Sequence, residues 1–471
     1  MDIQRARASI ERQWDESITP TLVEYIKIPN KSPAFDPDWK ANGYMEQAVE
    51  LAMRWITDHA PSDAKYRVVT LPGRTPVLVV DIPGSVSGNI ILYGHLDKQP
   101  EMTGWSDGLG PWKPVLRQDK LYGRGGADDG YALFASLAAI KTLREQNIAH
   151  PRCYLLIECC EESGSFDLPP YIEHLKAEIG EPDLVICLDS GAGNYDQLWC
   201  TTSLRGLISG TLSIDVLTEG VHSGDASGIV ASSFRIARIL LDRLEDAQSG
   251  DIKIESLNAD IPRQRIAQAR AAAAVLGSIV SVRFPFAGQT HAVDEDLTEL
   301  LINRTWRPAL STTGAGGLPS IDDAGNVLRP GTQLQLSIRT PPTVDAAAAF
   351  LDVKRRLEDA PPYGAQVRFT GSGVSGWHAP MLRPWLHKAL DDASQSWFGR
   401  ECMYMGEGGT IPFMGMLGET FPRAQFVITG VLGPGSNAHG PNEFLHLPMA
   451  KRLTGCVAQL IESFSQRQRT K

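Results

Sequence analysis

The chain has 471 residues, of which 42% are hydrophobic and 21% are charged, as is typical of a soluble globular protein with two or three domains. Its net charge of −10 and the lack of a basic stripe argue against nucleic-acid binding. No apolar run approaches the roughly 20 residues that span a bilayer, so we expect neither nucleic acid nor membrane as a partner.

The first part of the chain alternates helical patterns with strand patterns. Helices are predicted at 9–29, 44–60, 130–147 and near 169–179. Strands are predicted at 66–71, 77–82, 89–94, 153–160 and 183–188. This alternation predicts an α/β fold, with a mostly parallel sheet covered by helices.

The pattern changes near residue 203 and changes back near 380. Between these points, strands are predicted at 207–217, 333–339 and 365–370, and helices at 226–246, 264–275 and 343–358. This order favours a small antiparallel sheet with helices on one face, and the irregular stretch at about 250–328 resembles an insertion in this second domain. We therefore predict one α/β domain, 1–202 plus 380–471, interrupted by an α+β domain at 203–379.

The N-terminal sequence and the cysteines indicate the cellular compartment of the protein. The N-terminus lacks the apolar core of a signal peptide. There are seven cysteines, an odd number, and several lie within apolar runs, as expected for reduced cysteines of the core. We predict a cytoplasmic protein.

Potential metal ligands follow several of the apolar runs. His95 and Asp97 come after one predicted strand, Glu161 and Glu162 after another, and Asp189 after a third. Ligands bind at the carboxyl edge of open α/β sheets. A histidine that binds a metal through one ring nitrogen usually donates a hydrogen bond from the N–H of the other to a carboxylate. Asp97 could supply that carboxylate. Each residue alone has a plainer explanation, because loop histidines and solvated glutamates are common.

A glycine-rich loop at 123–130 carries Asp128 and Asp129 before a predicted helix. It lacks the Lys-Ser/Thr of a phosphate-binding P-loop. One of the two aspartates is expected to cap the helix. The other is then free to bind metal, and one carboxylate can bridge two cations.

Later segments add further polar groups. His439 lies in a loop of small residues, and the segment Glu407 to Pro412 offers glycine amides, including that of Gly409, and the Thr410 hydroxyl for a substrate carboxylate. In the second domain, His222 lies in a Val-His-Ser-Gly segment. Arg339 ends an apolar strand, where it could bind a carboxylate but more often pairs with an acid of the protein.

Taken in order, these motifs resemble those of the co-catalytic zinc peptidases that include carboxypeptidase G2, aminoacylase-1, succinyl-diaminopimelate desuccinylase and the carnosine and non-specific dipeptidases. The resemblance covers essentially the whole chain. The segments that carry it are His-x-Asp at 95–97, Gly-Arg-Gly through Asp-Asp at 123–129, Glu-Glu-Ser-Gly-Ser at 161–165, Asp189, Val-His-Ser-Gly at 221–224, Glu-Gly-Gly-Thr-Ile-Pro at 407–412 and Ala-His at 438–439.

The resemblance implies a dinuclear site for divalent metal ions, zinc first, with manganese or cobalt also compatible with the ligands. The first ion would be held by His95, Asp189 and a bridging Asp128, and the second by Asp128, Glu162 and His439. Glu161 would act as general base, and Asp97 would orient His95. The family also implies a cis peptide bond between Asp128 and Asp129.

The resemblance further implies that the second domain is a ferredoxin-like lid that forms a homodimer. His222 would reach the active site of the partner subunit and polarise the scissile carbonyl. Arg339, Thr410, Gly409 and Asn326 would hold the C-terminal end of the substrate.

The residues of these motifs are most similar to those of the dipeptidase branch. This similarity implies hydrolysis of dipeptides or small peptides. A carboxypeptidase or an N-acyl-amino-acid amidohydrolase is the alternative, and a non-catalytic peptide-binding relative is a third. The chain departs from many dipeptidases in having Gly130 in place of Lys and Thr410 in place of Ser.

Overall fold

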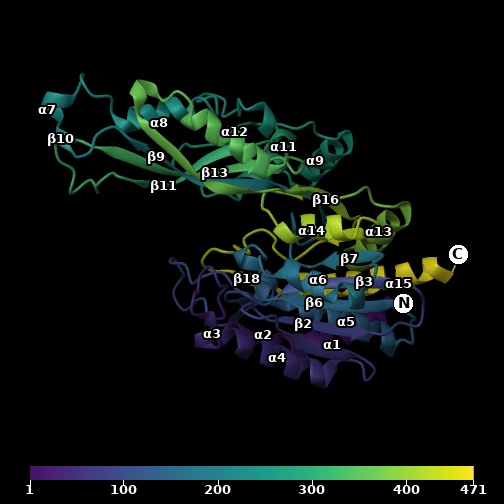
Figure 1. Cartoon of the computed structure of the whole chain (residues 1–471). Helices are drawn as coiled ribbons and strands as arrows, with labels where there is room; N and C mark the ends of the chain where they lie inside the picture. Colours follow the sequence, from purple (N-terminus) through teal and green to yellow (C-terminus); the bar gives the residue numbers. More distant parts are fainter. Residues whose placement is uncertain (470–471) are drawn as a thin grey trace.

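The computed structural model describes residues 1–469. The elements lie in two bodies, one above the other (Figure 1), and both termini belong to the lower body, which contains the larger sheet. The chain leaves that sheet after β8, forms the upper body, and returns at β15. The division of the chain into domains at 202/203 and 379/380 stays a prediction.

The large sheet has nine strands in the order β1-β2-β6-β3-β7-β17-β8-β15, with β16 pairing to β8. In sheet order these are β1 (Lys65–Val69), β2 (Val77–Ile82), β6 (Arg152–Glu158), β3 (Asn89–His95), β7 (Leu184–Cys187), β17 (Gln425–Ile428), β8 (Trp199–Leu204), β15 (Trp377–His378) and β16 (Met403–Glu407). Strands β6, β3, β7 and β17 run parallel. They are near-continuous apolar runs because both faces of the sheet are covered.

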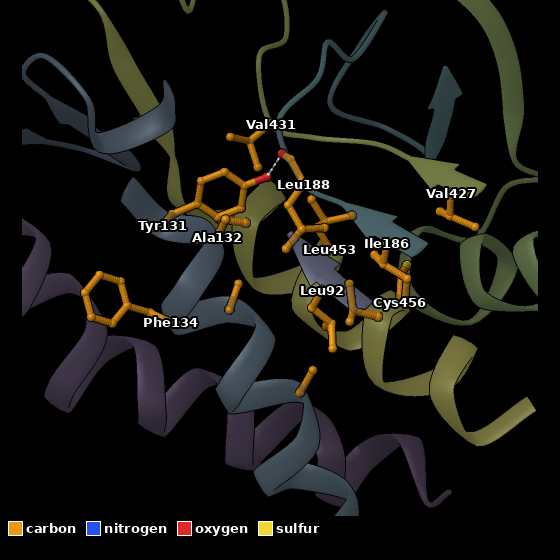
Figure 2. Packing of buried hydrophobic residues seen from close by; sticks show 14 of the residues in the cluster. Leu92, Tyr131, Ala132, Phe134, Ile186, Leu188, Val427, Val431, Leu453 and Cys456 are labelled. Atoms are coloured by element: carbon orange, nitrogen blue, oxygen red, sulfur yellow. Dashed lines mark hydrogen bonds between the residues drawn. The ribbon is translucent and has the colours of Figure 1, made fainter. Parts of the chain in front are cut away.

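Helices cover both faces of this sheet. One face bears α1 (Ile3–Gln13), α2 (Thr19–Ile26), α4 (Tyr44–His59), α5 (Tyr131–Glu145), α13 (Pro384–Phe398) and α15 (Leu447–Arg469), and the other bears α6 (Leu168–Ile179) and α14 (Pro412–Thr420). Successive side chains of a strand point to opposite faces, so Leu92 of β3 packs in the first core cluster and Tyr93 in the second. Figure 2 shows the first cluster, where the Tyr131 hydroxyl donates to the carbonyl oxygen of Leu188 at 2.5 Å.

The upper body contains an antiparallel sheet of four strands in the order β11-β13-β9-β14. The strands are β11 (Ala309–Gly316), β13 (Gly331–Thr340), β9 (Gly206–Asp215) and β14 (Gln366–Val374). Burial alternates along β9, because helices α8 (Ser233–Leu241) and α12 (Ala346–Glu358) cover only one face. This arrangement confirms the predicted α+β sheet. A two-stranded ribbon of β10 (Val221–His222) and β12 (Val327–Leu328) lies at the far tip.

Several helix boundaries differ from the predictions. The helix expected at 226–246 is a short turn, α7 (Ser223–Ala226), followed by α8, because Gly228 has a positive φ of 92° and breaks the run. The first helix begins earlier than predicted, since Asp2 accepts hydrogen bonds from the amides of Gln4 and Arg5 at 3.0 Å and caps it.

The helices of the predicted insertion pack against the large sheet. Its helices are α9 (Arg263–Leu276), α10 (Ile279–Val282) and α11 (Leu297–Thr305). Ala272, Leu301 and Trp306 are buried in the cluster that also covers the large sheet, and α9 lies against β16. The edge of the large sheet therefore covers the apolar side chains of these helices, whereas β11 of the same stretch joins the small sheet. The insertion at about 250–328 stays a prediction.

A small sheet of three strands completes the lower body near the site. Its strands are β4 (Val115–Arg117), β5 (Lys120–Tyr122) and β18 (Phe444–His446). No helix of residues 1–469 is long and apolar enough to cross a lipid bilayer.

Candidate metal centre

Three parallel strands bring most of the predicted ligands to one edge of the large sheet. His95 is the last residue of β3, Glu161 and Glu162 lie in a 3₁₀ turn just after β6, and Asp189 follows β7. Because β6 and β7 flank β3 in parallel, their carboxyl ends meet. The Tyr131 hydroxyl bond to Leu188 holds the chain directly before Asp189.

Two loops supply the remaining ligands. Asp128 lies in the glycine-rich segment Gly126–Gly130 that precedes α5, and His439 lies in the loop between β17 and β18 with φ of 65°. The peptide bond between Asp128 and Asp129 is cis, as the family resemblance predicts.

The ligand atoms form two groups that share Asp128. In the first group, His95 Nε2 lies 3.5 Å from Asp128 Oδ1 and 3.7 Å from Asp189 Oδ2. In the second, His439 Nε2 lies 3.1 Å from Asp128 Oδ2 and 3.3 Å from Glu162 Oε2. The two oxygens of Asp128 therefore face different histidines, as a bridging carboxylate between two cations requires.

The residues present fit divalent cations. His95 Nε2 is buried without a hydrogen-bond partner among the described residues, which is unusual unless a ligand takes the nitrogen. Burial and repulsion from neighbouring acids raise the pKa of Glu162 well above its ordinary value and raise that of Asp189 to about 7. Cations would remove this penalty by compensating the buried charges.

Asp97 orients the groups around it. Its Oδ1 accepts a hydrogen bond from the Glu161 amide at 3.1 Å, and its Oδ2 accepts one from the Glu162 amide at 2.9 Å. His95 Nδ1 lies 3.4 Å from Asp97 Oδ1 and 3.1 Å from the Asp97 carbonyl oxygen. One carboxylate thus fixes the turn that carries both glutamates as well as the histidine ring.

Asp129 does not have the predicted capping role. The first residue before α5 is Gly130, and no side chain caps the helix. Asp129 Oδ2 instead accepts a hydrogen bond from the His95 amide at 3.3 Å. The expectation that either aspartate caps this helix is wrong, because both turn toward the end of β3.

Sequence reasoning missed three residues that support the site. Gln99 Nε2 donates to Glu162 Oε2 at 2.6 Å. Arg124 and Glu443 form a buried ion pair at 2.5 Å, and Glu443 also accepts from the Gly125 amide at 2.8 Å. This pair ties the loop of Asp128 to the loop of His439, whose neighbour Gly440 offers its carbonyl oxygen to Arg124 at 2.8 Å. No local pattern marks residues that far apart in sequence as partners.

A cavity of about 500 Å³ opens beside the metal centre. Its lining includes Asp128, Glu161 and Asp189 of the metal centre together with Gly409 and Thr410. Arg339 Nη1 donates to Thr410 Oγ1 at 3.2 Å, so that the structure brings these predicted substrate residues together next to the metal ligands.

His222 and Asn326 lie elsewhere. His222 belongs to β10 and Asn326 directly precedes β12, and the Ser223 amide donates to the Asn326 carbonyl oxygen at 2.9 Å. His222 is exposed, and Figure 1 shows this ribbon at the tip of the upper body, away from the carboxyl ends of β3 and β7. The chain does not bring its own His222 or Asn326 to its own metal centre.

Residues 91–463 match Peptidase family M20/M25/M40. The chain belongs to this family. Because the match includes every residue of both ligand groups, the chain is a metal-dependent peptidase whose candidate ligands are those described above.

Similar proteins of known name include dipeptidases. The cysteinylglycine-S-conjugate dipeptidase of Corynebacterium striatum is 26% identical over 425 residues, covering 85% of this chain and 88% of that protein. The human Beta-Ala-His dipeptidase is 26% identical over 395 residues, covering 78% and 73%.

Solved structures share the fold. The di-peptidase Dug1p of Saccharomyces cerevisiae superposes with a TM-score of 0.77 at 20% identity, covering 99% of each chain. The M20 metallo-carboxypeptidase Sso-CP2 of Sulfolobus solfataricus gives 0.76 at 20% identity, covering 96% of this chain and 99% of its own. These similarities confirm the predicted catalytic fold with its lid.

Proposed function

We propose that this protein is a metallodipeptidase that hydrolyses the amide bond of dipeptides or other small peptides. One observation carries the proposal: Asp128 offers its two oxygens to two separate ligand groups, and Glu161 lies beside them without belonging to either group. The names of the two relatives support the dipeptide as substrate.

Each subunit would bind two divalent ions, one in each ligand group. His95, Asp189 and Asp128 would hold one ion, and Asp128, Glu162 and His439 the other. The nitrogen and oxygen donors suit zinc best, and manganese or cobalt also fit them. When bound, such ions lower the pKa of water and polarise a carbonyl or other acceptor oxygen.

Glu161 is the proposed general base. Its Oε2 lies 4.0 Å from His95 Nε2 and its side chain lines the cavity. Burial and the charge of Asp189 raise its pKa well above the ordinary value, toward the range in which a carboxylate accepts and returns a proton near neutral pH. Glu161 would take a proton from the attacking water and pass it to the leaving amine.

The cavity is also proposed to bind the free carboxylate of the substrate. Arg339 supplies a guanidinium, Thr410 a hydroxyl and Gly409 a backbone amide. A guanidinium binds a carboxylate with two parallel hydrogen bonds. This clamp would place the scissile bond over the metal ligands.

His222 and Asn326 are proposed to act across a homodimer formed by the upper body. Their place at its exposed tip supports this proposal, since neither lies near its own metal centre. A mixed dimer tests it: subunits with His222→Ala are combined with subunits with Glu161→Gln. If His222 acts in trans, one site carries both defects and the other carries none, so activity partly returns. Demonstrated mixed dimers without recovery would refute the role in trans.

The seven cysteines are all buried and unpaired, which supports the proposal of a cytoplasmic, reducing location.

A carboxypeptidase is the second candidate, favoured by the structural match to Sso-CP2. An N-acyl-amino-acid amidohydrolase would use the same site. The complete ligand set with Glu161 argues against a non-catalytic relative.

One substrate screen tests the proposal. Metal-loaded protein is assayed with dipeptides, longer peptides and N-acyl amino acids, before and after chelation and after zinc is added back. We expect dipeptide hydrolysis that the chelator abolishes and zinc restores. Faster hydrolysis of longer peptides would favour a carboxypeptidase, and faster hydrolysis of N-acyl amino acids would favour a deacylase.

A further inference from the structure

Positive charge accumulates around the cavity that opens beside the metal ligands. Arg283 lines the cavity together with Glu407, and Arg304 Nη2 lies 3.8 Å from Glu407 Oε2. Arg339 bonds Thr410, which also lines it. Arg205 lies directly behind, since a β-carbon added to Gly408 would be 3.3 Å from Arg205 Nη2.

These four arginines have too little negative charge around them. The pair Arg304–Glu407 is the one ion pair that any of them makes within residues 1–469. Arg205 is satisfied by the carbonyl oxygens of Gly408, Asn303 and Arg307 at 3.2–3.3 Å, so it keeps its full charge without a counterion.

The arginines also repel one another. Burial lowers the pKa of Arg205 to about 10, and the positive charges of Arg339 and Arg304 add to the shift. Burial likewise lowers the pKa of Arg283, with the charge of Arg304 adding to the shift and that of Glu407 opposing it. Partly buried cations that lower one another's pKa are stabilised by an anion.

One carboxylate is not enough to balance this positive charge. The C-terminal carboxylate of a dipeptide, held by Arg339, supplies one negative charge, and Glu407 supplies a second. Asp189, another acid of the cavity lining, belongs to a metal group. Arg304 has Glu407 as its partner at 3.8 Å, so Arg283, with Arg304 close by, is left for a further anion. The Arg304 Nε is buried without a partner among the described residues.

We infer that Arg283 and Arg304 form a subsite for a second carboxylate, so that the preferred substrates are dipeptides with aspartate or glutamate as the C-terminal residue. The inference rests on the proposed dipeptidase function and names its substrate class. Both arginines come from the inserted segment around α10 and α11, and this segment therefore determines specificity while the large sheet supplies the chemistry.

The test compares Ala-Glu with Ala-Gln, which have the same shape and differ by one charge. We expect the metal-loaded protein to hydrolyse Ala-Glu with a kcat/KM roughly tenfold or more above that for Ala-Gln, since a hydrogen bond to a charged group is worth about 1.5–3 kcal/mol. The ratio should fall as ionic strength rises, because salt screens partly exposed charges.

Variants assign the preference to the two arginines. Arg283→Gln and Arg304→Gln should each lower the Ala-Glu to Ala-Gln ratio, and the double variant should bring it close to one. Arg307→Gln is the matched control, because the Arg307 side chain leaves the same helix end to pair with Glu299 at 2.7 Å. Its ratio should equal that of the unmodified protein. The Arg283 guanidinium lies over the ring of its neighbour Phe284 and forms no ion pair within residues 1–469, so its replacement should not disturb folding.

The outcomes separate this inference from the proposed function. Equal hydrolysis of Ala-Glu and Ala-Gln by the unmodified protein would overturn the inference and leave a dipeptidase. A preference for Ala-Glu that survives in the double variant would also overturn it. If metal-loaded protein hydrolyses neither dipeptide, nor Ala-Ala as a neutral reference, the proposed function fails and the inference fails with it.

Discussion

Replacing Asp97 by Asn should weaken metal binding although Asp97 is not a proposed ligand. The carboxylate accepts hydrogen bonds from the amides of Glu161 and Glu162, one on each oxygen. An asparagine has one acceptor oxygen, so its NH₂ group would face one of these N–H groups. The variant keeps the shape of the side chain but leaves a buried donor unsatisfied and the turn poorly held.

The expected loss follows from that unsatisfied donor. Leaving a buried donor unpaired costs about 1–3 kcal/mol, which corresponds to roughly 5- to 150-fold in an equilibrium constant. Loss of a partner that orients a metal-binding histidine typically costs 10–100-fold in metal affinity. We therefore expect zinc affinity to fall by about one to two orders of magnitude, with a parallel fall in kcat/KM at limiting metal.

Competition with a chelating dye measures the affinity directly. Asp183→Asn is the matched control, because Asp183 also accepts a backbone hydrogen bond, from the Asn89 amide at 3.1 Å, but is exposed at the opposite end of the sheet. Its zinc affinity should be unchanged. An Asp97→Asn protein that binds zinc within threefold of the unmodified protein would refute the reasoning that Asp97 holds the glutamate turn in place.

Three further predictions address the base, the bridge and an interior histidine. Glu161→Gln should keep its metal and lose roughly 10²–10⁴-fold in turnover, and near-normal turnover would exclude it as the base. Asp128→Ala should weaken both sites together in elemental analysis, and two tightly bound ions would contradict a bridge. Burial and the charge of Arg265 lower the pKa of His378 to about 4. Unfolded histidine takes up its proton near pH 6.5, so the unmodified protein should lose stability relative to His378→Gln as pH falls from 6.5 toward 4. A constant difference in urea midpoints would refute this.

The sequence predicted that metal ligands gather at the carboxyl edge of the large sheet, because short stretches of sequence are enough to mark that edge. Apolar runs that end at His95 and Asp189 mark buried parallel strands, and the carboxyl ends of such strands meet. Asp128 and His439 come from loops, and their pairing at 3.1 Å followed from the family resemblance, since no period or propensity joins residues so far apart.

What the sequence did not predict depends on tertiary contacts. The inserted segment carries apolar residues such as Leu301 and Trp306. A hydrophobic pattern predicts that such residues are buried, but it does not indicate which sheet they pack against. Arg124 and Glu443 are separated by 319 positions, and their ion pair is visible only once both loops are folded. One of Asp128 and Asp129 was expected to cap the helix that follows, whereas the Asp129 carboxylate accepts a hydrogen bond from the amide of His95.

Anomalous diffraction from a crystal of the zinc-loaded protein tests the central claim most directly. We expect two peaks per subunit, about 3.5–4 Å apart as in other two-metal sites. One should lie among His95, Asp128 and Asp189, and the other among Asp128, Glu162 and His439. A single peak at full occupancy, or two peaks that do not share Asp128, would contradict the dinuclear centre on which the proposed function depends.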